Sequence, residues 1–101
     1  MTVPEVPAEK LTPDEKIVSK VTLNIRGGRV YDYSVVYWAS PEKPVMSESA
    51  VYVFPIAPWQ KTKTVYIDSD VTGLLIVPVV FRGGDFVIRS IDVTKYQVKR
   101  N

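Results

Sequence analysis

Two stretches with an Arg-Gly-Gly core decide the predicted fold of this 101-residue chain: IRGGRVYDY at residues 25–33 and FRGGDFVIR at residues 81–89. They hold four of the five glycines, and each lies between runs of valine, isoleucine and aromatic residues. Glycines between two runs of strand-forming residues are typical of hairpin turns. The sequence therefore predicts two β-hairpins, whose structural turn residues are Gly27, Gly28, Gly83 and Gly84.

Each predicted hairpin has a preferred register. In the first, a three-residue loop over residues 26–28 places Leu23 opposite Tyr31 and gathers apolar side chains on one face. The second can close through a two- or a three-residue loop. The two-residue loop, which places Val79 opposite Ile88, is slightly preferred.

The composition and the spacing of apolar residues predict an all-β fold. Eighteen valines, seven isoleucines and six tyrosines stand against four leucines, which favours strands. Period-two or short apolar runs predict six strands, near residues 17–25, 29–40, 49–54, 61–68, 74–81 and 85–93. Pro78 cannot donate a ladder hydrogen bond, so its strand should lie at an edge or carry a bulge. We expect a small antiparallel β-sandwich that is jelly-roll-like.

The amino-terminal part predicts an arm followed by one domain. Residues 1–12 contain two prolines and should form an extended arm with little means of folding on itself. Residues 13–101 should form the single β-sandwich domain. Thr12 and Glu15 match a Thr-x-x-Glu capping box, which predicts a short helical turn over residues 13–18.

The chain contains neither cysteine nor histidine. This excludes a disulfide framework, the usual zinc sites and every nucleophile–base pair that needs one of these side chains. Asp68 and Asp70 resemble the first ligands of a calcium loop. The downstream glutamate and the further oxygen ligands of such a loop are missing, which favours a plain turn. We therefore expect no metal site, no cofactor and no enzymatic activity.

The charge of the chain is nearly balanced, because thirteen Lys and Arg against eleven Asp and Glu give +2. A basic stripe is the usual footprint of a nucleic-acid-binding domain, so this balance argues against nucleic acid as a partner. No apolar run is long enough to span a bilayer, and the amino terminus lacks the pattern of a signal peptide. These features predict a cytoplasmic location or, for a viral protein, a place in the virion.

Residues 59–93, WQKTKTVYIDSDVTGLLIVPVVFRGGDFVIRSIDV, resemble the closing half of galactose-binding-like, jelly-roll carbohydrate-binding modules. In that family a tryptophan often opens a strand, and a valine-rich strand, a glycine turn and a closing strand with an Asp-Val pair follow. Trp59 and the pair Asp92-Val93 match these positions. The resemblance implies a jelly-roll-like sandwich with sugar binding, but it places none of the family's calcium or sugar ligands on this chain.

Two regions are candidate contact sites. The arm carries Val3, Pro4, Val6 and Pro7, which are apolar enough to contact a partner, and its prolines reduce the entropy lost on docking. Extended arms that dock on neighbours are typical of small β-sandwich subunits in large assemblies such as virus capsids. Trp59, flanked by loops, is the best candidate for an exposed binding aromatic, although core packing is the commoner fate of such a residue.

The sequence therefore predicts a non-enzymatic structural or assembly protein, such as a capsid decoration protein or minor capsid protein of a virion. Its partners would be other protein subunits, in a homo-oligomer or a capsid shell. The alternative is a carbohydrate-binding module with glycan partners. A third hypothesis is a single-strand nucleic-acid binder that stacks its tyrosines on bases.

Overall fold

The computed structural model describes residues 2–7, 10–28, 31–45, 51–79 and 87–100. They form six strands, near the six predicted positions, and every strand pair is antiparallel. The strands are β1 (Glu15–Arg26), β2 (Asp32–Ala39), β3 (Val51–Ile56), β4 (Thr62–Ile67), β5 (Gly73–Val79) and β6 (Val87–Lys99). The prediction of a small antiparallel all-β fold is confirmed.

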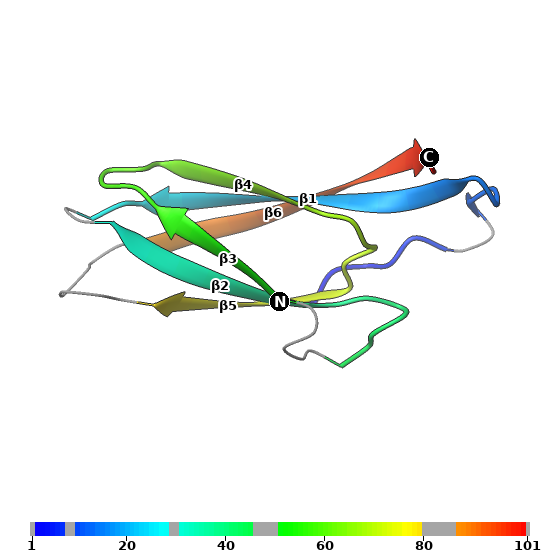
Figure 1. The fold of residues 1–101 in the computed structure, drawn as a ribbon, viewed down its shortest axis with the longest axis horizontal. Coiled ribbons are helices and arrows are strands. Elements are labelled where there is room, and N and C mark those ends of the chain that lie inside the picture. Colours follow the sequence, from blue (N-terminus) through cyan, green and yellow to red (C-terminus); the bar gives the residue numbers. More distant parts are fainter. Residues whose placement is uncertain (1, 8–9, 29–30, 46–50, 80–86, 101) are drawn as a thin grey trace.

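The strands form two three-stranded sheets, with the orders β4–β1–β6 and β3–β2–β5 (Figure 1). We call the first the long sheet, because β1 and β6 have 12 and 13 residues, and the second the short sheet. Alternate side chains of both sheets point into one shared core, which includes Leu23, Phe54 and Leu74. β5 is an edge strand, as its Pro78 predicted.

The predicted helical turn over residues 13–18 is wrong. Residues 13–14 form a turn, and β1 begins at Glu15. One Thr12–Glu15 contact of a capping box is nevertheless present, because the Thr12 backbone N–H donates to Glu15 Oε1 at 3.3 Å. The β-branched residues that follow join the sheet, so the motif closes a turn without starting a helix. Within the described ranges, no helix is long and apolar enough to cross a bilayer.

The first predicted hairpin is also wrong. β1 lies between β4 and β6 in the long sheet, whereas β2 lies between β3 and β5 in the short sheet. Leu23 is paired with Lys63 on one side and Ile91 on the other, and not with Tyr31. The segment that contains Gly27 and Gly28 therefore carries the chain from one sheet to the other.

The second predicted hairpin has the same error. Ile88 of β6 is paired with Ile25 of β1, and Val79 of β5 is paired with Tyr33 of β2. The two strands that flank the second Arg-Gly-Gly triplet thus belong to different sheets. The triplet itself, with Gly83 and Gly84, lies outside the described residues.

Gly27 is required by a close approach between two backbones. Its N–H donates to the Gln60 carbonyl at 2.8 Å, and the Trp59 N–H donates to the Gly28 carbonyl at 2.9 Å. A Cβ on Gly27 would lie 2.4 Å from the Gln60 nitrogen and 2.9 Å from the Ala57 carbonyl oxygen. Both are backbone atoms, which cannot rotate away, so only glycine fits where this link crosses the β3–β4 connection.

We expect Gly27→Ala to lower the free energy of unfolding by about 2 kcal/mol or more, because the methyl group overlaps backbone atoms. Urea unfolding measures this change. Lys61→Ala, at an exposed neighbouring position, is the control and should stay within about 0.5 kcal/mol of the parent. Equal stability of the Gly27 variant and the parent would contradict the observed crossing of the two segments.

Candidate functional site

The N-terminal arm packs on its own domain. Thr2 forms an isolated antiparallel bridge with Gly73, and the Val3 N–H donates to the Thr72 carbonyl at 2.9 Å. The Val3 side chain is buried in the core between the sheets. The arm is therefore held by its own domain, and its extended conformation does not require another protein. The residue before a proline keeps its own N–H, and Val3 uses that N–H to pair with the domain.

The other predicted contact residues of the arm lie nearer the surface. Pro4 and Pro7 are exposed, and Val6 is half-buried. The Pro4 carbonyl and the Val6 N–H both bind groups of the same domain. Contact of these side chains with another protein stays a prediction, but the arm no longer needs a partner to hold it.

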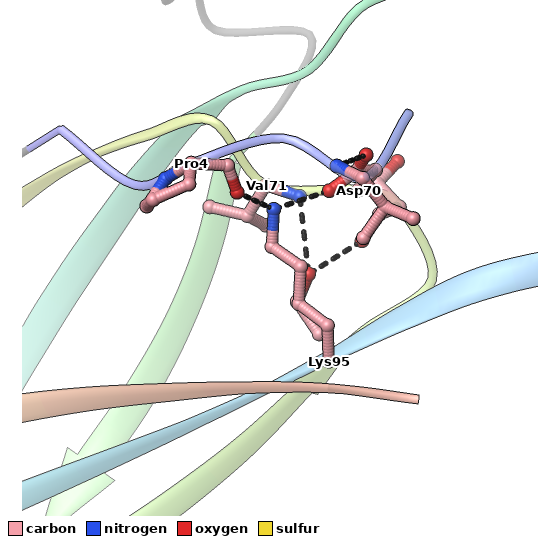
Figure 2. A network of polar contacts seen from close by, with 7 residues as sticks. Pro4, Asp70, Val71 and Lys95 are labelled. Atoms are coloured by element: carbon pink, nitrogen blue, oxygen red, sulfur yellow. Dashed lines mark hydrogen bonds and ion pairs between the residues drawn. The ribbon is translucent and has the colours of Figure 1, made fainter. Parts of the chain in front are cut away.

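Lys95 and Asp70 form an ion pair that fixes the arm (Figure 2). The Lys95 ammonium donates to both the Asp70 carboxylate and the Pro4 carbonyl. The second oxygen of that carboxylate accepts the Val6 N–H at 2.8 Å. The two side chains are only 13% and 11% exposed, so the pair is largely removed from water. It joins β6, the β4–β5 connection and the arm.

Ser19 of β1 also binds the β4–β5 connection. Its hydroxyl donates to the Ser69 carbonyl at 2.7 Å and accepts the Val71 N–H at 3.0 Å. The Thr72 N–H donates to the Ala39 carbonyl at 2.8 Å. Each residue from 69 to 72 thus has a hydrogen-bond partner elsewhere in the fold, which fixes the point where the chain passes between the sheets.

The two aspartates that resembled a calcium loop bind lysines. Asp68 pairs with Lys16 at 3.0 Å on the surface, and Asp70 pairs with Lys95. Among the described residues, no group of three or more His, Cys, Asp or Glu side chains is arranged to hold a metal ion. A hollow of about 670 Å³ opens at this end of the sandwich, and its lining carries both Lys16 and Arg100 and the two aspartates. Its mixed charge favours neither anions nor cations.

We expect Asp70→Asn to lower the free energy of unfolding by about 3 kcal/mol, because it leaves the Lys95 ammonium largely buried without its counter-charge. Asp68→Asn is the matched control, two residues away. It breaks an exposed pair and should cost about 0–1 kcal/mol. Chemical denaturation of both variants tests the difference, and equal effects would show that the Asp70 pair has no special structural role.

Trp59 lies at the other end of β1, in a strained turn. The turn spans residues 57–60 and is closed by the Gln60 N–H, which donates to the Ala57 carbonyl at 3.2 Å. Pro58 takes its second position, and Trp59 takes the third with a φ of 61°. This arrangement fits a type II turn, in which glycine or asparagine is preferred at the third position. A bulky residue there costs on the order of 1 kcal/mol or more.

The Trp59 side chain recovers little of that cost by packing, because it is 67% exposed. Three exposed cations lie around it: Arg26 at the end of β1, Lys61 before β4 and Arg89 in β6. We call these four residues the Trp59 rim. They line a shallow hollow of about 620 Å³ whose described lining residues include no carboxylate. Within the described part of the chain, none of the three cations forms a salt bridge.

Arg89 reaches the rim through a β-bulge. Asn24 is paired with Ser90 and Ile25 with Ile88, so Arg89 is the additional residue between two ladder positions. Bulges re-aim side chains and are frequent next to functional sites. The Trp59 rim therefore lies next to three irregular features of the backbone: the bulge at Arg89, the positive φ of Trp59 and the close approach of Gly27 to the β3–β4 connection.

A second candidate surface covers the outer side of the short sheet. Alternate residues of its three strands point away from the core, and the register places them in rows across the sheet. We call this surface the apolar face; its described members are Tyr33, Val35, Tyr37, Val51, Val53, Pro55, Leu75 and Val77. Val53 and Leu75 are 60% and 52% exposed, and no member carries a charge.

Sequence reasoning found one member of the Trp59 rim and missed the others. The flanking loops made Trp59 the best candidate for an exposed aromatic, although core packing was the commoner expectation for such a residue, and the side chain is exposed. Arg26, Lys61 and Arg89 come from three separate parts of the chain, and only the strand order β4–β1–β6 brings them together. The apolar face was missed because the predicted hairpins assigned Tyr33 to the same sheet as Leu23. The apolar face could have been predicted only from the correct pairing of β2 with β3 and β5.

The chain was compared with protein-family models, with curated proteins and with solved structures. The resemblance of residues 59–93 to galactose-binding-like modules is neither supported nor contradicted by that comparison and stays a prediction. None of the three comparisons found a match.

Proposed function

We propose that this protein is a non-enzymatic structural subunit that assembles with further copies of itself through the apolar face. The single observation that supports this proposal is the eight-residue outer surface of the short sheet, on which no side chain is charged. An exposed contiguous apolar patch of a few hundred Å² is often a functional surface. An apolar side of a β-sheet is normally covered by a second layer of structure. The long sheet covers the inner side of the short sheet, whereas the outer side is exposed.

The edges of the short sheet favour contact through its face. β3 and β5 are its two edge strands, and they carry Pro55 and Pro78. A proline has no N–H to donate to an added strand, and prolines at an edge are a common protection against edge-to-edge pairing. The exposed face carries no comparable protection. An uncharged, self-complementary surface of this kind can pack against its own copy about a two-fold axis.

The size of the apolar face sets the expected strength of association. Three strands about 4.8 Å apart and about five residues long cover a few hundred Å². A stable dimer commonly buries about 800 Å² on each partner. One pairwise two-fold contact is therefore weak and closes at a dimer, so a stable larger assembly needs further contacts at another surface. A subunit that makes such further contacts in a large assembly, such as a small virion component, is our more specific proposal.

A carbohydrate-binding module is the second candidate. The observation that favours it is the exposed indole of Trp59, since sugar rings can pack on an exposed aromatic side chain. The absence of cysteine and histidine from the chain supports a binding or structural role over a catalytic one in both cases.

Sedimentation velocity over a range of concentrations tests the assembly proposal. The parent should associate between about 1 µM and about 1 mM. Val53→Lys should remain monomeric, because it places a charge at the centre of the apolar face while an exposed position tolerates it in the folded monomer. Thr64→Lys, on the outer side of the long sheet, is the control and should associate as the parent does. A parent that stays monomeric throughout, or a Val53 variant that associates normally, would refute the proposal.

A further inference from the structure

We infer that the outer side of the long sheet binds single-stranded nucleic acid, with Trp59 stacking on a base and the cations of the Trp59 rim neutralising phosphates. This inference rests on the long sheet alone and is independent of the proposed assembly through the short sheet. Proteins that bind single strands combine exposed aromatic platforms with a positively charged path for the backbone. Both elements lie on this surface.

The aromatic platforms are spread along the sheet. Trp59 stands at one end, and Tyr66 and Tyr96 are 63% and 44% exposed on the same outer side. The register places Tyr66 beside Lys20 and Tyr96 beside Val18 on the central strand β1. From the level of Asn24, next to the rim, to that of Val18 is six residues, or about 20 Å. A strand of several nucleotides can contact all three rings.

The charges of the outer side favour a polyanion. Its cations are Lys16, Lys20 and Arg26, with Lys61 and Arg89 beside Arg26 in the rim at one end of the sheet, and its carboxylates are Asp68 and Asp92. Asp68 is already paired with Lys16. The three cations of the rim form no salt bridge within the described residues and are available to a ligand. The net charge of +2 for the whole chain argued against nucleic acid, but the described residues of this side and the rim carry more cations than carboxylates.

The backbone of the rim holds an exposed aromatic ring at a strained position. Glycine at position 59 would remove the strain of the positive φ, and the solvent-exposed indole contributes little to the core. A structural role does not explain why a tryptophan stands at this position. Stacking on a flat ligand does, because the exposed ring lines the same hollow as the three cations.

A base is a better fit than a sugar for this arrangement. A neutral sugar leaves three unpaired cations without a partner. A sulfated or carboxylated sugar satisfies the cations but does not need flat rings at separate points along the sheet. A nucleic-acid strand supplies one phosphate and one flat base with every nucleotide, which matches both the cations and the rings.

Fluorescence anisotropy with a labelled oligothymidylate of about 12 nucleotides tests the inference. The parent should bind at low salt and weaken as salt rises. Trp59→Gly should weaken binding about tenfold or more, the loss expected for one stacked base, while its melting temperature stays equal to or above that of the parent. Arg89→Gln should weaken binding and reduce the slope of log affinity against log salt by about 0.7, the value for one phosphate contact.

Two controls separate this surface from general charge attraction. Lys43→Gln removes an exposed cation in the segment after β2, outside the Trp59 rim, and Leu75→Ala changes the apolar face; both should bind as the parent does. A heparin-derived oligosaccharide is the competing probe. The inference is overturned if the oligothymidylate does not bind, if Trp59→Gly binds it as tightly as the parent, or if the oligosaccharide binds more tightly than the oligothymidylate.

Discussion

The ion pair between Lys95 and Asp70 is the interaction on which the rest of the structure depends. It lies at the end of the sandwich where the chain passes from the long sheet to the short sheet, and it also forms hydrogen bonds with the arm. A largely buried ion pair is stable only when its remaining donors and acceptors are satisfied. The Pro4 carbonyl and the Val6 N–H supply those partners. The arm therefore completes the domain, and the two sheets can present their outer sides independently.

The outer sides have opposite character, and this division supports the two proposed roles. The short sheet exposes valines, a leucine and tyrosines without a charge, which suits contact with protein. The long sheet exposes lysines, arginines and separated aromatic rings, which suits a polyanion. A subunit built in this way could join its own copies on one side while a nucleic-acid strand occupies the other. The average composition of the chain hides this division.

Local patterns in the sequence predicted the strands well, because period-two alternation and β-branched residues act within a few positions. They failed at the two Arg-Gly-Gly triplets, because a glycine pair suits both a hairpin and a crossing between sheets. The requirement for Gly27 comes from the backbone of residues 57–60, about thirty positions away in the chain. The same limit applies to the candidate site. The flanking loops marked Trp59 as the best candidate for an exposed aromatic without deciding between exposure and core packing, whereas the bulge at Arg89 and the cluster of cations depend on strand order.

A double-mutant cycle for Asp70 and Lys95 tests the central claim most directly. Asp70→Asn, Lys95→Met and the double variant would be unfolded in urea, and the coupling energy taken from the three changes in unfolding free energy. We predict a coupling of about 1–3 kcal/mol, with the double variant more stable than the sum of the single losses implies, since removing both charges leaves neither buried alone. Additive losses within about 0.5 kcal/mol would contradict the account, because the two groups would then contribute to the fold separately.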